Sequence, residues 1–494
     1  MSNYQTLDVS GKPYNRNLLV LVLLVGSFVT VINQTLLATA LPTIMDTFDI
    51  SASTAQWLST GFLLVNGIMI PISAWMLTRF STKTLYISAM SIFLMGTIIC
   101  YSAPSFLILL LGRLIQAVGV GFSMPMLQTV MLSIFPPEKR GAAMGMTGIV
   151  IGLAPAIGPT YSGWIVDNFS WRVLFGPLIP ISILVIVLSI LFMKKVLPTK
   201  KVGIDVWSVI YSTIGFGALL YGVSSVGDKG WGSTEVIIES IVGILFILIF
   251  TLRQLRIENP LVDLRVFKST TFTLATLISS LSTMAMIGAE MVLPLYIQNI
   301  HGETAFNSGL MLLPGALMLG IFMPISGLIV DKKGAKRLAI IGMFFLTIAT
   351  IPFIFLTPTT SIVSIMVIYG IRMVGVGLVM MPVTTVGMNS LTDNLIKHGT
   401  AANNTLRQVA SSIGTAILIS VLTNVTTNQL PDQSLLKSTP LEYKAQATDA
   451  MMAGYHASFI VAVFFGAVGL IVAFFLKEKK KEAIILSNEG GMKE

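Results

Sequence analysis

The sequence predicts an all-α membrane protein of fourteen transmembrane helices, arranged as two six-helix bundles with two extra helices between them. Three observations support this prediction. The chain of 494 residues is 54% hydrophobic and only 11% charged, whereas soluble proteins contain about 25% charged residues. Apolar segments of about 20 residues, the length that crosses a bilayer, recur along the chain. Two stretches of the first half also recur in the second half.

The apolar segments give the predicted order of the helices. The first 17 residues are polar and precede a full-length span without a clear cleavage site, so we expect a short lead and no signal peptide. Residues 423–454, between the last two spans, are polar and are expected to form the longest loop. The predicted spans begin near Leu18, Ala55, Thr84, Phe106, Ala143, Val173, Val206, Val236, Thr271, Phe306, Arg337, Thr360, Asn403 and Tyr455.

The positive charges predict the orientation of these helices. The net charge of +9 could suggest a nucleic-acid partner, but its distribution argues against one. Most lysines and arginines fall in alternate loops, on the side of both termini. This bias predicts that both termini are cytoplasmic. We therefore expect a multi-pass protein of the cell membrane, with the lipid bilayer as its partner. The opposite loops contain only Arg172, Lys229, Lys437 and Lys444.

An internal repeat divides the chain. AWMLTRFSTKTLY (74–86) matches GLIVDKKGAKRLA (327–339) at an offset of 253 residues, and AVGVGFSM (117–124) matches MVGVGLVM (373–380) at an offset of 256. Two matches at nearly one offset indicate duplication. Each match jumps eight spans, so two extra helices lie between halves of six. The predicted parts are a lead (1–17), an N-terminal bundle (18–193), a linker with the extra helices (194–270), a C-terminal bundle (271–476) and a tail (477–494).

The stretch GIVIGLAPAIGPTYSG (148–163) lies inside the fifth span. Two of its glycines have the spacing that lets two helices approach closely, and its prolines remove backbone donors and favour a kink. The stretch predicts either a packing notch or a contact between two helix bundles that rock against each other. The residues of this conformational motif are Gly148, Gly152, Pro155, Gly158, Pro159 and Gly163.

Several motifs carry a family resemblance. GLIVDKKGAK (327–336) resembles the GxLaDrxGrk motif, RLIQAVGVG (113–121) resembles RxxqGxG, and the glycine- and proline-rich stretch resembles the exporter motif of the fifth helix. ENPLVDLRVFK (258–268) and GTAANNTLRQVASSIGTAIL (399–418) complete the likeness. The chain therefore resembles the 14-helix drug:proton antiporters of the major facilitator superfamily, the EmrB/QacA type. The resemblance implies the major facilitator fold and proton-driven export of small amphipathic or cationic compounds.

Two departures from the family pattern limit what is transferred. The first-half loop has Thr78 where the family has Asp, and INQTLLATALP (32–42) has Asn33 where the family has an acid. The proton role of that acid is therefore not transferred. The second-half loop is the better candidate for the cytoplasmic latch that the family implies. The expected latch residues are Asp331, Lys332, Gly334 and Lys336, with Arg79 from the first-half loop.

The sequence argues against other classes of protein. It contains no GxxxxGK[ST] nucleotide-binding run, and its three histidines and one cysteine show no metal-ligand spacing. No arrangement of side chains suggests catalysis. We therefore expect a transporter, not an enzyme, with no metal or cofactor, driven by the proton gradient and functional as a monomer.

Glu290 is the one acid that the pattern places deep in a span. It lies eight residues before Gln298, about 12 Å from the outer end of its helix at the rise of an α-helix. An embedded carboxylate costs at least ~2.5 kcal/mol, and such residues usually face a cavity or a partner. Glu290 is therefore predicted to bind a proton, a substrate or both. The alternative is a structural hydrogen bond to a neighbouring helix.

Other polar residues lie at similar depths. Arg113 and Asn33 lie about 10–12 Å from the outer ends of their spans, and the family resemblance places these spans around a central cavity. We predict that they form a site with Glu290, the alternative being fixed contacts between helices. Arg407 is interpreted as snorkelling or structural. Further candidates for the cavity wall are Gln34, Gln116, Met286 and Arg372.

The resulting prediction is an exporter that alternates access around a cavity between two bundles. An exporter or flippase of an endogenous lipid or metabolite with the same fold remains as an alternative. A sensor or assembly partner without transport is a third class, which the embedded Glu290 argues against.

Overall fold

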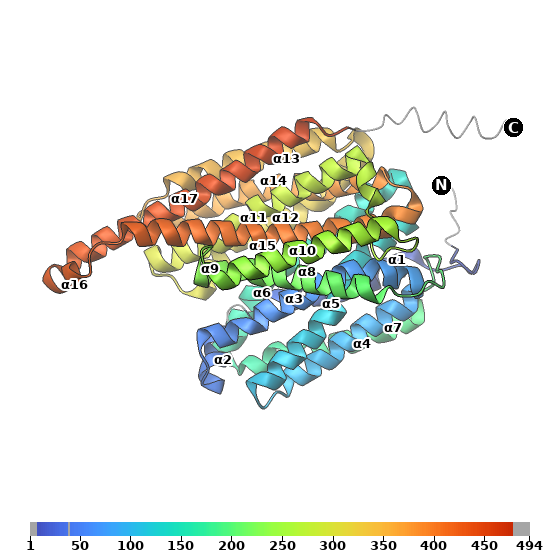
Figure 1. The fold of residues 1–494 in the computed structure, drawn as a ribbon, viewed down its shortest axis with the longest axis horizontal. Helices are drawn as coiled ribbons and strands as arrows, with labels where there is room; N and C mark the ends of the chain where they lie inside the picture. Colours follow the sequence, from blue (N-terminus) through green and yellow to red (C-terminus); the bar gives the residue numbers. More distant parts are fainter. Residues whose placement is uncertain (1–6, 38–39, 478–494) are drawn as a thin grey trace.

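The described residues include fourteen helices that are long and apolar enough to cross a membrane, which confirms the predicted fold class. The computed structural model describes residues 7–37 and 40–477. Residues 1–6 of the predicted lead and 478–494 of the predicted tail lie outside the described residues. Figure 1 shows the long helices running roughly side by side, with the blue N-terminal half and the orange and red C-terminal half on opposite sides.

The N-terminal half forms its own packed core, in which apolar side chains from the first helix contact those of the helices that follow. Ser51 caps the second long helix by accepting a hydrogen bond from the backbone nitrogen of Thr54 at 3.3 Å. The helices of this half are α1 (Arg16–Thr35), the short α2 (Leu41–Phe48), α3 (Ala52–Arg79), α4 (Thr82–Tyr101), α5 (Phe106–Ile134), α6 (Arg140–Asn168) and α7 (Leu178–Phe192), with 3-10 turns η1 (Pro137–Lys139) and η2 (Trp171–Leu174).

The C-terminal half forms a second core. Its first helix, α11, contains Pro294, and its second, α12, contains Pro314 and Pro324, so each lacks backbone donors within the membrane-spanning segment. The helices of this half are α11 (Thr270–His301), α12 (Ala305–Lys333), α13 (Lys336–Thr350), α14 (Ile362–Asn389), α15 (Ile396–Gln429), the short α16 (Ser434–Ser438) and α17 (Pro440–Phe474), with 3-10 turns η3 (Leu264–Lys268), η4 (Ile351–Phe355) and η5 (Asp393–Leu395).

Two further helices, α8 (Val206–Ser224) and α10 (Thr234–Arg256), lie between the halves in the sequence and are joined by the short α9 (Val226–Lys229). They pack against each other, and α8 also contacts α3 of the first half and α15 of the second. Figure 1 shows this green pair lying across the boundary between the two halves. The pair therefore covers one flank of that boundary.

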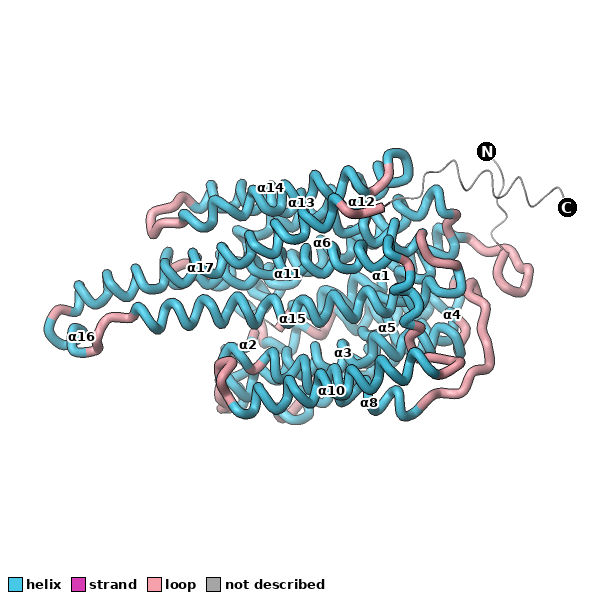
Figure 2. Tube along the Cα trace, turned by 45° about the horizontal axis from the view of Figure 1, so that its top comes forward, coloured by secondary structure: helices cyan, strands magenta, loops and turns pink. Residues whose placement is uncertain are grey.

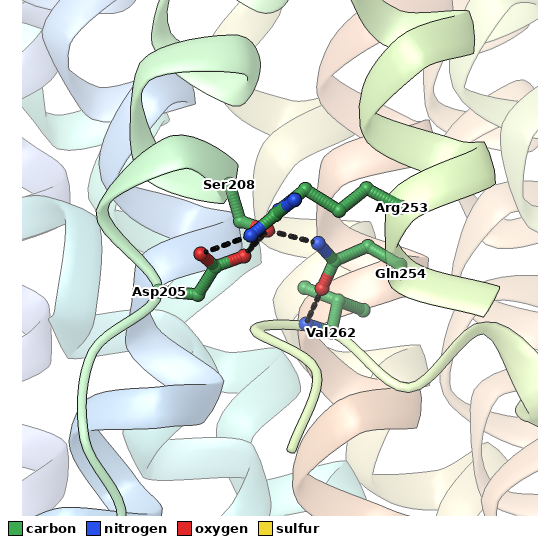
Figure 3. Close-up of polar contacts among 5 residues, drawn as sticks. All are labelled: Asp205, Ser208, Arg253, Gln254 and Val262. Atoms are coloured by element: carbon green, nitrogen blue, oxygen red, sulfur yellow. Dashed lines mark hydrogen bonds and ion pairs between the residues drawn. The ribbon is translucent and has the colours of Figure 1, made fainter. Parts of the chain in front are cut away.

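A polar cluster holds the ends of α8 and α10 together (Figure 3). Arg253 donates two hydrogen bonds to the Asp205 carboxylate, at 2.7 and 2.8 Å. Gln254 donates to the Ser208 hydroxyl and accepts from the backbone nitrogen of Val262 at 3.2 Å. The same cluster therefore fixes both the helix pair and the loop that leads to the second half.

The ion pair of this cluster predicts a pH-dependent contribution to stability. The hydrogen bonds that Arg253 donates to Asp205 hold the pKa of this carboxyl below its usual value. The stabilisation from the ion pair is therefore present at neutral pH and is lost as the pH falls through the lowered pKa. Asp205→Asn should reduce the free energy of unfolding by about 1 kcal/mol at pH 7, a modest figure because the pair is partly exposed. Thermal unfolding of the purified protein should show this difference shrinking towards pH 3. A difference that stays constant with pH would contradict this account.

The prediction of a long loop at residues 423–454 is wrong. Helix α15 continues to Gln429 and α17 already begins at Pro440, with α16 between them. Gly454 allows close packing here, since a Cβ at this position would lie 2.7 Å from the carbonyl oxygen of Leu422. Figures 1 and 2 show α15 and α17 projecting together beyond the other helices. At 34 and 35 residues, each helix is about 50 Å long, which exceeds the hydrocarbon core of a bilayer.

Candidate functional site

A cavity of about 860 Å³ lies between the two halves. Its walls come from α1, α3, α5 and α6 of the first half and from α11, α12, α14 and α15 of the second. Among the described residues, its lining includes none from α8 or α10. One end of the molecule is called the terminal face here. It is formed by the end of α3, the start of α6, the end of α12 and the start of α15. The lining reaches towards the opposite face, at Gln56, Gln298 and Ser308.

Glu290 lines this cavity from α11 and is half-buried. Pro294, four residues further on, has no backbone N–H, so the helix does not provide the usual donor for the Glu290 carbonyl oxygen. In the described part of the chain, no lysine, arginine or histidine nitrogen lies within 4.0 Å of the Glu290 carboxylate oxygens. The carboxylate is therefore available to a proton or a ligand in the cavity.

Arg113, Asn33 and Gln116 are brought together, but within the first half and away from the cavity lining. The Arg113 guanidinium donates to the Gln116 side chain at 3.0 Å and to the Asn33 carbonyl at 3.2 Å. The Asn33 amide donates to Gln116 at 3.3 Å. All three are buried, and the guanidinium lies 4.1 Å from the ring centroid of Phe62. The structure thus differs from the predicted site with Glu290, because these side chains bind neighbouring helices of their own half.

Arg372 occupies the matching place in the second half. Its guanidinium donates to Thr350 at 2.9 Å, to the Met286 carbonyl at 3.3 Å and to the Ala285 carbonyl. It is buried and is not part of the cavity lining, which differs from its predicted place in the wall. Among the described residues, it forms no ion pair with Glu290.

The two buried networks are related by the sequence repeat. Gln116 donates to the Thr97 hydroxyl at 2.9 Å, and Arg372 donates to the Thr350 hydroxyl at the same distance. Gln116 and Arg372 are 256 residues apart, and Thr97 and Thr350 are 253 apart, the offsets of the two sequence matches. The repeat therefore predicts the partners of these side chains as well as the order of the helices.

Of the remaining candidates for the cavity wall, Gln34 and Met286 do line the cavity. Arg407 also lines it, from α15, although the sequence favoured a snorkelling or structural role. Gln128 of α5 and Asn404 of α15 meet at the wall, where the Asn404 amide donates to the Gln128 side chain at 2.7 Å. The family-like run at 399–418 was the signal that could have placed Arg407 and Asn404.

The glycine-rich motif of α6 faces the second half along the contact between α6 and α12. A Cβ on Gly148 would lie 2.5 Å from the Met323 side chain, and one on Gly152 would lie 2.9 Å from the backbone nitrogen of Gly320. Gly163 similarly meets Phe306 at the start of α12. These glycines allow two helices from different halves to lie in close contact.

Other motif residues have different neighbours. A Cβ on Gly158 would collide with the Thr35 hydroxyl of α1, so this glycine serves packing within the first half. Pro155 lines the cavity. Pro159 belongs to α6, but its side chain lies outside the described residues. The motif thus combines contact between the halves, packing within one half and part of the cavity wall.

Polar contacts join the two halves at the terminal face. The Asp331 carboxylate, near the end of α12, accepts hydrogen bonds from the backbone nitrogens of Gly141 and Ala142 at 2.8 Å each. A carboxylate at a helix N-terminus is favoured by the unpaired N–H groups and the helix dipole. Arg140 also forms an ion pair with Asp393 at 3.1 Å. The sequence missed Arg140, whose position next to the glycines at the start of α6 was the available signal.

The other expected latch residues lie at the ends of their helices. Gly334 ends α12 with a φ of +81°, which favours glycine. Lys332 lies in the last turn of α12 and Lys336 begins α13. Arg79 ends α3 and is exposed. Among the described residues no group of three or more His, Cys, Asp or Glu could hold a metal ion.

Comparison with known proteins places this architecture in a family. The family model of the major facilitator superfamily matches residues 23–415. The uncharacterized MFS-type transporter YcnB of Bacillus subtilis is 48% identical, over 96% of this chain and 98% of its own length. The lincomycin resistance protein LmrB of Bacillus subtilis is 38% identical, over 96% and 99%.

A solved structure is similar in fold at low identity. The crystal structure of the human organic anion transporter MFSD10 matches with a TM-score of 0.64 and 11% identity, over 92% of this chain and 99% of the other. Together with the fourteen membrane-spanning helices, these matches identify a multi-pass membrane protein. The chain belongs to the major facilitator superfamily of transporters.

Proposed function

We propose that the protein exports amphipathic or cationic compounds across the cell membrane in exchange for protons. The observation that carries this proposal is Glu290, a carboxylate without an ion-pair partner in the described chain, on the wall of a cavity between two bundles. The relatives of this protein include a lincomycin resistance protein, which supports small toxic compounds as substrates. Because one chain supplies both walls of the cavity, a monomer is sufficient for transport.

The exchange follows from competition for one carboxylate. A cationic substrate binds Glu290 when the cavity is open to the cytoplasm, and a proton from outside displaces the substrate when the cavity is open to the outside. A charge crossing 100 mV yields ~2.3 kcal/mol, and one pH unit adds ~1.4 kcal/mol. The proton gradient thus supplies the energy, and no cofactor is required.

Alternating access requires the halves to separate at one face and meet at the other. The charge bias along the sequence supports a cytoplasmic location for the terminal face and for both termini. The contacts of Asp331 with α6 and of Arg140 with Asp393 then close the cytoplasmic end. The glycines of α6 provide the contact with α12 about which the halves rock. Opening to the cytoplasm must break the contacts at the terminal face.

An efflux assay with and without an uncoupler tests this proposal. Cells that express the protein and retain ATP should keep a panel of cationic dyes at a low internal concentration, and an uncoupler should abolish that difference. Efflux that persists unchanged with the uncoupler would contradict proton coupling. A carrier of an endogenous lipid or metabolite would instead leave unrelated cationic dyes without mutual competition for binding.

A further inference from the structure

Two hydrogen-bond donors on the cavity wall have no partner within the described protein. They are the Nε atom of Arg407 and the Nε2 atom of Gln128, and both atoms are buried. No side-chain oxygen of the described lining residues is buried and unpartnered in the same way. A buried donor left unpaired is destabilising. This part of the cavity is therefore short of acceptors.

A hydrogen bond between the halves joins the two helices that carry these donors. Asn404 donates to the Gln128 side-chain oxygen at 2.7 Å and to the Thr400 carbonyl at 2.9 Å. The first bond occupies the oxygen of the Gln128 amide and leaves its nitrogen as the unpartnered donor. Arg407 lies three residues after Asn404, so the two side chains share one face of α15. The two unpartnered donors thus belong to α5 and α15, and both residues line the same cavity.

The charge of Arg407 has the same consequence. Within the described chain, Arg407 takes part in no ion pair, although it lies in a membrane-spanning segment, where an uncompensated charge is costly. A guanidinium presents a planar set of donors that matches the two oxygens of a carboxylate. An anionic group is therefore the ligand chemistry that satisfies Arg407 and Gln128 together.

We infer that Arg407 and Gln128 form an anion-binding subsite in the cavity, and that the protein therefore accepts zwitterionic amphiphiles as well as cations. This inference rests on the proposed export function, since Glu290 is taken to hold the cationic group. Glu290 and Arg407 are the two described lining residues with a formal charge, and they lie on different helices, α11 and α15. A compound with both a cationic and a carboxylate group matches both.

A matched pair of dyes isolates the anionic group. Rhodamine B has a cationic ring system and a free carboxylate, whereas its ethyl ester has the same ring system and no carboxylate. Binding of each dye to the purified full-length protein is measured by fluorescence anisotropy, at a pH where the carboxylate is ionised. Arg407→Gln should weaken binding of rhodamine B about tenfold or more, as expected for a charge-assisted hydrogen bond, and should change binding of the ester less than about threefold.

Two further variants keep the test decisive if Arg407→Gln does not fold. Arg407→Lys keeps the charge without the planar donors and should restore part of the affinity for rhodamine B. Gln128→Glu preserves the side-chain shape and puts a negative charge where the subsite needs a donor, so it should weaken rhodamine B selectively. Arg256→Gln, at an exposed position at the end of α10, is the matched control and should change neither dye.

The outcomes separate the subsite from the export function. Equal weakening of both dyes by Arg407→Gln, or no weakening of either, would overturn the subsite and leave Arg407 a structural cation. If Arg407→Gln weakens rhodamine B selectively but the wild-type protein exports neither dye from vesicles, export is refuted and the subsite stays in place.

Discussion

Glu290→Gln should abolish proton-coupled efflux of cationic dyes. The substitution mimics the protonated carboxyl at nearly unchanged volume, so a cation loses its counter-charge and a proton can no longer displace it. Affinity of the wild-type protein for a monovalent cation should fall as the pH is lowered, because protons compete for the same carboxylate. The variant should bind the cation weakly and with the same affinity at every pH.

Efflux of ethidium from vesicles and binding titrations at several pH values measure this effect. Glu239→Gln is the matched control, because Glu239 is an acid on α10 that does not belong to the cavity lining. The control should behave as the wild type. Wild-type coupling and pH dependence in the Glu290→Gln variant would leave Glu290 a structural residue and the proposed mechanism without its acid.

Gly152→Leu should abolish transport while the protein remains in the membrane. A Cβ at this position already lies 2.9 Å from the backbone nitrogen of Gly320 and 3.1 Å from its Cα, and backbone atoms cannot move aside as a flexible side chain can. A leucine must therefore push α6 and α12 apart. Because these helices belong to different halves, their close contact is lost, and with it the contact about which the proposed mechanism has the halves rock.

Dye efflux normalised to the amount of protein in the membrane measures this effect. Gly217→Leu is the control, since Gly217 lies on α8 and a Cβ there would have Ile68 as its nearest neighbour, at an ordinary 3.6 Å. It should retain most of the activity. Normal efflux by Gly152→Leu would show that close contact between α6 and α12 is not needed for transport.

Much of the fold is predictable because the bilayer sets the length of each apolar segment and the repeat orders the segments. The two inserted helices follow from the number of spans that separate the repeated motifs. The helical extension around Gly454 was not predictable, because its residues are polar and hydropathy reports only apolar spans. The extension is helical because α15 and α17 pack against each other there, as at Leu422 and Gly454, which are distant in the sequence.

The helix that carries each side chain was predictable, but the direction in which the side chain points was not. Glu290 and Asn33 were predicted at similar depths, yet only Glu290 lines the cavity. Successive residues of a helix differ by about 100° in direction, and Gln34 lines the cavity where its neighbour Asn33 does not. A helix that is apolar on most faces gives no periodic signal to fix its orientation. Arg407 lines the cavity, whereas its position near one end of a span suggested the membrane surface.

Coupled movement of protons and substrate is the most direct measure of the central claim. Proteoliposomes are loaded with ethidium, whose permanent charge prevents it from carrying protons itself, and with a pH-sensitive fluorophore. They are then diluted into dye-free buffer at equal pH inside and outside. As ethidium leaves through the protein, protons should enter and the interior should acidify, and both fluxes should be absent with Glu290→Gln. Ethidium efflux through the wild-type protein with no change of internal pH would contradict proton exchange.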